Sequence, residues 1–249
     1  MSTYDHDGLR LHYETVGSGP GVLCVHGASG SGAYDWAQLA DALSGTHRVV
    51  IPDLRGHGKS DHRKGELALE LIEEDLRALV QHEDLGNPHL IGFSFGAEVA
   101  LRLALHHPDL PASLVLISPG LGTTKSVDAA KAEVPSRDRL ERGWPRELRD
   151  LHTERHGPDH WVEVMQELWV RHAERVFIPL EDLAVLTCPI LLIHGSSDDP
   201  RRIRQAQLFV GANANARIVE INGGAHAVHK DHPDEVHRVV ADFLSEVSP

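Results

Sequence analysis

Three segments that lie far apart in the sequence carry side chains suited to nucleophilic catalysis. The first is Gly92–Gly96 (GFSFG), in which Ser94 directly follows an apolar run and directly precedes a helical pattern. A serine on a sharp strand-to-helix turn presents its hydroxyl clear of the sheet, and glycines on both sides leave room for the neighbouring strand and helix. The hydroxyl is a weak nucleophile, so it needs a base that removes its proton and an acid that orients the base.

Candidates for that base and that acid follow two later apolar runs. His226 follows the run Ile218–Ile221, and the adjacent Asp198 and Asp199 follow the run Ile190–Ile193. In a parallel sheet the carboxyl ends of the strands meet at one edge, so residues that follow different strands come together there. The sequence therefore predicts a site for acyl transfer built from a serine, a histidine and one of two adjacent carboxylates.

The elements that must position these residues alternate between strands and helices. Short apolar runs bounded by Gly, Pro or Asp predict buried strands at 22–25, 49–51, 90–91, 114–117, 190–193 and 218–221. Helical patterns occur between and after these runs at 69–80, 97–105 and 236–244. We expect Gly86 to end the first helix and the second to end before Pro108, and Pro233 suits the first turn of the third. This alternation predicts an α/β fold with a mostly parallel sheet covered by helices on both faces. The first 20 residues predict an antiparallel hairpin at the edge of the sheet.

The alternation stops between residues 121 and 186, where four prolines interrupt a charged stretch whose periodicity is helical. We expect residues 1–120 and 187–249 to form one core and 121–186 to form a helical cap inserted over the open end of the sheet. Trp161, Met165 and Leu168 fall on one helical face. We expect Trp161, Met165 and Trp169 to contact the substrate. The same apolar stripe would also suit a helix face that only packs against the protein core.

Composition and charge narrow the class of protein further. The 249 residues suit a single core, and a net charge of -13 disfavours binding to nucleic acid or to an anionic membrane. No apolar run approaches the roughly 18 residues of a membrane span, and the first residues lack the pattern of a signal peptide. Cys24 and Cys188 have no CxxC partner, which argues against a redox site. We therefore expect a cytoplasmic protein that acts on a small molecule.

Two other motifs imitate ligand sites. Gly58–Ser60 (GKS) resembles the end of a phosphate-binding loop, but position 53, where that motif requires glycine, is Asp53. The run His226–His232 is similar to the HxHxDH ligand run of dinuclear zinc lactonases, but its first spacing is one residue too long. We therefore expect neither a metal nor a cofactor.

With these motifs in place, the chain resembles the α/β-hydrolase superfamily over nearly its full length. The resemblance implies that Ser94 is the nucleophile and His226 the base. It favours Asp198 over Asp199 as the acid, because the family acid usually stands three residues after the glycine that ends the strand, here Gly195.

The resemblance also extends to two loops. His26–Gly30 is similar to the oxyanion-loop segment of the family, which implies that the backbone N–H groups of Ala28 and Phe95 bind the developing oxyanion. The segment Asp53–Ser60 is similar to the loop that follows the next strand in the family, which we interpret as structural.

Within the superfamily, a serine at position 94 argues against the branches that use an aspartate nucleophile. The segment Leu151–Trp161, which leads into Trp169, is similar to the cap of biphenyl-hydrolase-like (valacyclovirase-type) esterases. Members that take amino-acid esters tend to carry an aspartate after the nucleophile. Here that residue is Phe95, so an apolar or aromatic acyl group is expected.

The resemblance thus implies a cofactor-free serine hydrolase that forms an acyl-enzyme on Ser94. Its substrate would be a small carboxylic ester, a lactone or a thioester. Two alternatives stay open at this point. One is a carbon-carbon bond hydrolase of the ring-cleavage type, and the other is a ligand-binding protein without catalysis on the same scaffold.

Overall fold

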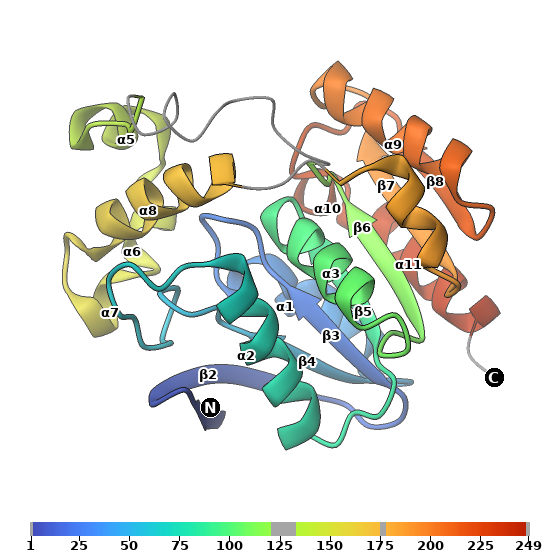
Figure 1. The fold of residues 1–249 in the computed structure, drawn as a ribbon, viewed down its shortest axis with the longest axis horizontal. Coiled ribbons are helices and arrows are strands. Elements are labelled where there is room, and N and C mark those ends of the chain that lie inside the picture. The colour runs from blue at the N-terminus through green and yellow to red at the C-terminus, as the bar shows by residue number, and fades with distance from the viewer. Residues whose placement is uncertain (1, 121–132, 175–177, 248–249) are drawn as a thin grey trace.

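An eight-stranded sheet forms the centre of the molecule (Figure 1). The computed structural model describes residues 2–120, 133–174 and 178–247. The strands follow the order β1-β2-β4-β3-β5-β6-β7-β8 across the sheet. Their bounds are β1 (Ser2–His6), β2 (Leu9–Val16), β3 (Gly21–Val25), β4 (Arg48–Pro52), β5 (His89–Phe93), β6 (Ser113–Ile117), β7 (Ile190–Gly195) and β8 (Ala216–Ile221). Strands β1 and β2 form an antiparallel hairpin at one edge, as predicted, and β2 also pairs with β4 in antiparallel orientation. The other six strands, β4-β3-β5-β6-β7-β8, are all paired in parallel, which confirms the predicted mostly parallel sheet.

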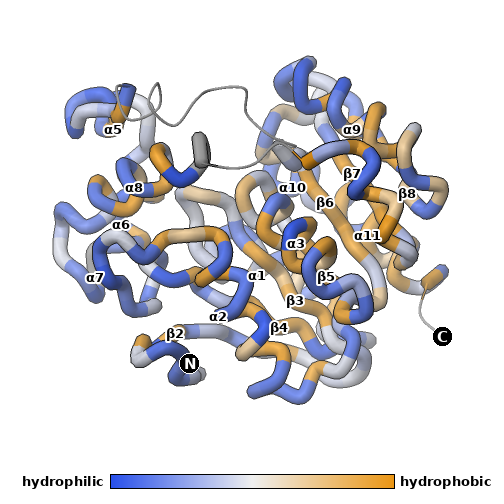
Figure 2. Tube along the Cα trace, viewed as in Figure 1, coloured by the Kyte–Doolittle hydropathy of each residue, from blue (hydrophilic) through white to orange (hydrophobic). Residues whose placement is uncertain are grey.

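The central strands are apolar on both faces. In β6, Leu114 and Leu116 belong to one buried cluster, while Val115 and Ile117 belong to the cluster on the opposite face. Successive side chains of a strand point to opposite faces, so a strand covered on both sides needs apolar residues throughout. Figure 2 accordingly shows the central strands largely in the orange of hydrophobic residues.

Helices cover each face of the sheet. One face carries α2 (Leu69–His82), α3 (Phe95–His106) and α9 (Pro200–Ala212), and the other carries α1 (Gly32–Leu43) and α11 (Pro233–Val247). The structure confirms the three predicted helices, with one correction. Helix α2 ends at His82, before Gly86, because Asp84 already adopts a positive φ of 47° and turns the chain out of the helix.

The regular elements described between β6 and β7 are all helical. They are α5 (Arg137–Gly143), α6 (Arg146–Asp150), α7 (Thr153–His156), α8 (His160–Glu174) and the 3-10 helix η1 (Leu180–Val185). Figure 1 shows α5, α6, α7 and α8 gathered beside one end of the sheet. The first twelve residues of the expected cap, 121–132, lie outside the described residues.

Side chains of this helical segment hold the loops that follow β3 and β4. Glu167, on α8, accepts the backbone N–H groups of Gly65 and Leu67 at 2.9 and 2.7 Å. Three histidines of the segment bind backbone carbonyl oxygens as donors through their Nε2 atoms. The pairs are His152 with Ser29, His156 with Ser60, and His160 with Gly56, at 3.2, 2.8 and 2.9 Å. The segment is thus attached to the loops that surround the candidate site.

Candidate active site

Ser94 lies on the turn between β5 and α3 in a backbone conformation that non-glycine residues rarely adopt. Its φ is 51° and its ψ is -112°. Gly92 and Gly96 make this turn possible because a Cβ on Gly92 would lie 2.4 Å from the carbonyl oxygen of Gly96, and a Cβ on Gly96 would lie 2.1 Å from that of Val25. Such a strained position is retained where the surrounding structure determines it, and it is often functional.

The imidazole of His226 lies between Ser94 and Asp198. Its Nε2 atom is 3.0 Å from the Ser94 Oγ, and its Nδ1 atom is 3.2 and 3.3 Å from the two carboxylate oxygens of Asp198. The three residues follow β5, β7 and β8, so the parallel sheet brings their segments to one edge as the sequence predicts. With the proton on Nδ1 facing Asp198, Nε2 is left as the acceptor for the serine proton.

Asp198 is held in its ionised form by its neighbours. Its side chain is only 2% exposed, and burial by itself would raise its pKa. The imidazoles of His194 and His226 and the backbone N–H of Asp199 outweigh burial, so the pKa of Asp198 lies well below its usual value. A carboxylate that stays charged can stabilise an imidazolium beside it.

The neighbouring carboxylate has a different structural task. Asp199 is the N-cap of α9 and accepts the backbone N–H of Arg201 at 2.9 Å, and the guanidinium of Arg201 lies 2.6 Å from its Oδ2 atom. These contacts turn Asp199 toward its own helix, and no described contact joins it to His226. The structure therefore places Asp198, and not Asp199, beside the histidine.

Residues 26–30 form a loop between β3 and α1, called the 26–30 loop below. The backbone N–H of Leu54 donates to Nε2 of His26 at 3.0 Å, so Nδ1 carries the proton and donates to the Gly27 carbonyl at 2.7 Å. That carbonyl also accepts the Gly30 N–H at 3.2 Å. In a trans peptide the N–H points away from the C=O, so the direction of the Ala28 N–H is fixed by these contacts.

Two further imidazoles hold the carbonyls of this loop. His57 Nε2 lies 3.0 Å from the carbonyl oxygen of Ala28, and His152 Nε2 lies 3.2 Å from that of Ser29. Phe95, the other residue expected at an oxyanion site, is the first residue of α3, and its side chain is buried. The N-terminus of a helix favours negative charge, which suits an oxyanion that develops next to Ser94.

The residues expected to contact the substrate lie on α8. Trp161 and Met165 are buried in the apolar cluster that also contains residues of α2 and α3, and the Arg149 guanidinium lies 5.6 Å from the Trp161 ring centroid. Trp169 is half-buried, with the Arg139 guanidinium 5.5 Å from its ring centroid. Their role in substrate binding stays a prediction.

The sequence analysis missed three residues that adjoin the site. His194 is buried at the end of β7, with Nδ1 3.6 Å from the Asp198 Oδ2. The Phe93 ring centroid lies 5.2 Å from that of His226, and Asp35 accepts the Gly27 N–H at 2.9 Å. The position of His194, at a strand end just before Asp198, could have been noted in the sequence. The contacts of Phe93 and Asp35 depend on how β5 and α1 pack, so the sequence carries no signal for them.

The His226–His232 motif considered above does not bring its side chains together as a set of metal ligands. Within the described ranges 2–120, 133–174 and 178–247, no three His, Cys, Asp or Glu side chains are grouped as metal ligands would be. In the run His226–His232, His226 faces Ser94, whereas the His229 ring packs against Phe93 and Trp36, at 4.3 and 5.1 Å between centroids. Over the same described ranges, no helix has the length and apolar character needed to cross a membrane.

Comparisons with known proteins identify the family of this chain. Residues 22–239 match the model of the alpha/beta hydrolase family. The crystal structure of the enol-lactonase from Burkholderia xenovorans LB400 has a TM-score of 0.77 at 23% identity, with 98% of this chain and 100% of that chain covered. The match to the family model shows that this chain belongs to the alpha/beta hydrolase family, and the structural similarity agrees with its fold.

Two curated relatives align with less than half of the chain. The pimeloyl-(acyl-carrier protein) methyl ester esterase of Vibrio cholerae is 36% identical over 110 residues, which are 44% of this chain and 41% of the esterase. An uncharacterized protein of Mycobacterium tuberculosis is 33% identical over 121 residues, 49% of this chain and 35% of that protein. Each alignment spans less than half of the relative.

Proposed function

We propose that this hydrolase cleaves small carboxylic esters, including lactones or thioesters, through an acyl-enzyme on Ser94. The observation that carries the proposal is the continuous contact from Ser94 Oγ to His226 Nε2, 3.0 Å, and from His226 Nδ1 to Asp198, 3.2 Å. The esterase among the relatives and the lactonase of the same fold support carboxylic esters as the substrate class.

In the first half of the reaction, His226 Nε2 takes the proton of Ser94 while the serine oxygen attacks the carbonyl carbon of the ester. The imidazolium formed in this step is stabilised by Asp198, which keeps its negative charge. The backbone N–H groups of Ala28 and Phe95 donate hydrogen bonds to the oxyanion. As the C–O bond to the alcohol breaks, His226 returns the proton to the leaving oxygen, and the acyl group stays on Ser94.

In the second half, a water molecule replaces the alcohol. His226 removes a proton from the water as its oxygen attacks the acyl carbon, and then returns that proton to Ser94 Oγ as the acyl-oxygen bond breaks. The products are a carboxylic acid and the free serine. All the groups that move protons belong to the chain itself, so the mechanism needs no cofactor.

The acyl group is expected to be apolar or aromatic. Phe95 follows the nucleophile, and its side chain is buried in the apolar cluster, so this position offers no carboxylate to an ammonium group on the substrate. Residues 121–186 would form the cap over the site, and Trp161, Met165 and Trp169 would contact the acyl group from that cap.

The proposal is tested with p-nitrophenyl esters and a fluorophosphonate probe. Wild-type protein should hydrolyse the esters and be labelled, whereas Ser94→Ala should lose both properties. Ser245→Ala, at an exposed position of α11, is the matched control and should behave like the wild type. Labelling of Ser94 without ester turnover would favour the ring-cleavage hydrolase, and absence of both would favour a binding protein; either result would overturn the proposal.

A further inference from the structure

A buried carboxylate lies directly behind the 26–30 loop. Asp35 is in the first turn of α1, and its side chain is only 4% exposed. Its Oδ2 atom accepts the Gly27 N–H at 2.9 Å, and a Cβ placed on Gly30 would come within 2.6 Å of the same oxygen. The carboxylate therefore contacts both ends of the turn that presents Ala28.

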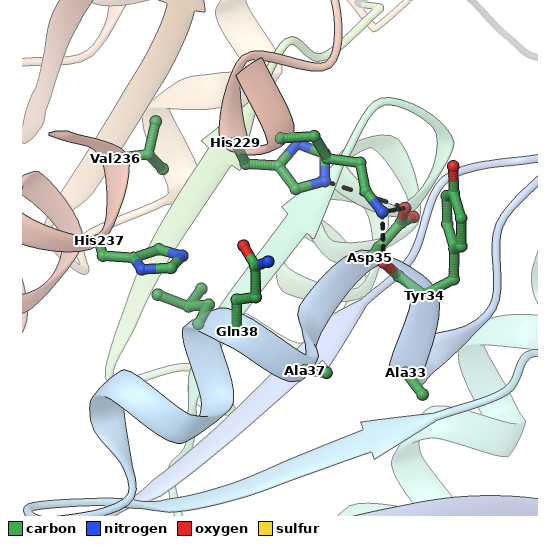
Figure 3. Close-up of a pocket in the computed structure, with 10 residues that line it drawn as sticks. Ala33, Tyr34, Asp35, Ala37, Gln38, His229, Val236 and His237 are labelled. Carbon is green, nitrogen blue, oxygen red and sulfur yellow. Dashed lines mark hydrogen bonds and ion pairs between the residues drawn. The ribbon is translucent and has the colours of Figure 1, made fainter. Parts of the chain in front are cut away.

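The other side of the Asp35 carboxylate faces two basic residues of α10 (Val228–Asp231), His229 and Lys230. Figure 3 shows His229 beside Asp35. Its Oδ1 atom is 3.9 Å from His229 Nε2 and 3.9 Å from Lys230 Nζ. Lys230 also donates to the carbonyl of Tyr34 and lies 3.3 Å from the centroid of the Tyr34 ring. These residues line a cavity of about 400 Å³ between α1 and the helices α10 and α11.

Helix α10 begins two residues after His226, so these contacts join two parts of the candidate site. On one side is the loop that carries Ala28, and on the other is the segment that carries the base. The His229 ring also packs 4.3 Å from Phe93, whose ring lies 5.2 Å from His226, both measured between centroids. A change at Asp35 would thus reach both the 26–30 loop and the histidine.

The charge on Asp35 has a physical basis in its surroundings. Burial by itself would raise the pKa of this carboxyl, but the nearby His229 and His26 and the Gly27 N–H outweigh burial and lower it. A buried charge that is paired and hydrogen-bonded is costly to leave unpaired, so a contact of this kind holds its partners in a defined geometry.

We propose that Asp35 is a positioning residue that fixes the Gly27–Ala28 backbone for oxyanion binding and couples it, through Lys230 and His229, to the segment that carries His226. This inference rests on the proposed function, because it assigns Asp35 a part in stabilising the transition state. Asp35 touches neither the substrate nor the reacting atoms, and it acts only through the backbone it holds.

The experiment compares Asp35→Ala and Asp35→Asn with wild type, and uses Asp41→Asn, an exposed position on the same helix, as the matched control. Two quantities are measured: kcat and KM for p-nitrophenyl acetate, and the Kd of phenylboronic acid. A boronate bonded to Ser94 is tetrahedral, so its oxygen occupies the oxyanion position. A merely structural role would not weaken the boronate selectively.

We expect Asp35→Ala to lower kcat by about 10- to 100-fold, a fall no larger than the one that removal of a whole oxyanion donor causes. The KM should stay within about twofold of the wild-type value. The Kd of phenylboronic acid should rise by a similar factor. Asp35→Asn keeps an oxygen that can accept the Gly27 N–H, and it should recover most of kcat. Asp41→Asn should match the wild type in both measurements.

Lys230→Met provides a second variant that leaves the Gly27 contact in place. It should lower kcat by a few-fold in the wild-type background and have little further effect when combined with Asp35→Ala, because the two residues act through one contact. The inference is overturned if Asp35→Ala changes only thermal stability, or if kcat falls while boronate binding is unchanged. A wild-type protein without ester turnover or fluorophosphonate labelling would instead refute the proposed function itself.

Discussion

His226 Nδ1 lies 3.2 Å from the Asp198 carboxylate, while the adjacent Asp199 binds the backbone and guanidinium of Arg201. Two neighbouring carboxylates thus have separate tasks, one beside an imidazole and one at a helix N-terminus. The reason is geometric, because Asp199 directly precedes α9, whose first N–H groups need a cap. Asp199 supplies that cap and Asp198 remains available to the histidine.

This division of tasks leads to a direct comparison of two variants. Asp198→Asn is expected to lower kcat by roughly 10⁴-fold, because an amide favours the wrong tautomer of His226 and cannot stabilise its protonated form. Asp199→Asn, the matched control one residue away, should change kcat by less than about tenfold because an asparagine still caps a helix. Steady-state kinetics with a p-nitrophenyl ester measures both. A larger loss in Asp199→Asn would assign the acid role to that residue instead.

The histidines between the helical segment and the core are expected to make stability depend on pH. Burial lowers the pKa of His152 to about 4, while its Nδ1 accepts the Gly58 N–H and its Nε2 donates to the Ser29 carbonyl. Burial also holds the pKa of His57 well below its usual value. In the unfolded chain a histidine titrates near pH 6.5, so the unfolded state binds more protons between about pH 6.5 and about pH 4.

The free energy of unfolding should therefore fall as the pH falls through that window, by at most about 1.4 kcal/mol per pH unit for each such histidine. Urea unfolding followed by circular dichroism, at several values between about pH 7 and about pH 4.5, measures the slope. His152→Gln keeps a donor and an acceptor but does not titrate, so its slope should be smaller. His107→Gln, outside the segment, serves as the control, and equal slopes in all three proteins would contradict the prediction.

Removal of metal ions is expected to leave the activity unchanged. A serine activated by a histidine and a carboxylate generates its nucleophile without a metal. Ester turnover should therefore be the same before and after exhaustive dialysis against a chelator. A loss of turnover that zinc or manganese then restores would show that a metal takes part, and would revive the lactonase motif at His226–His232 as a ligand set.

The mostly parallel sheet and the meeting of Ser94, Asp198 and His226 could be predicted because both follow from local patterns, whereas the order of the strands across the sheet is not among the predictions. Buried parallel strands need apolar residues on both faces, and residues that follow such strands share one edge of the sheet. Helix α1 is not among the predicted helices, although Trp36, Leu39 and Leu43 show helical spacing and are buried. Its signal lies in a stretch with several small residues, which weakens the pattern.

Other features of the site depend on tertiary packing and left no local signal. The contact between Asp35 and Gly27 exists only because α1 folds back behind the loop that precedes it. The histidines at 152, 156 and 160 are spaced as in many helical segments, and their binding to the carbonyls of Ser29, Ser60 and Gly56 depends on where the segment docks. The sequence contains 19 histidines, and no local pattern distinguishes these three from the others.

The tryptophans of α8 allow a test that separates substrate binding from packing. Trp161 is buried with Met165 in the apolar cluster, whereas Trp169 is half-buried beneath Arg139. Trp161→Ala should lower the free energy of unfolding by about 3 to 5 kcal/mol, as truncation of a buried tryptophan typically does, and Trp169→Ala should lower it by less.

If the cap selects the acyl group, at least one of these two variants should also change the ratio of kcat/KM between acetyl and bulky aromatic esters. The reason is that a pocket discriminates through its contacts with each transition state, and removing an indole ring relieves the limit on acyl size. Trp144→Ala, a third tryptophan of the segment that is not among the predicted contact residues, controls for general loosening of the helices. The prediction is refuted if the acyl-length profile is the same in Trp161→Ala, Trp169→Ala and wild type, whatever their stabilities, because both side chains would then only pack.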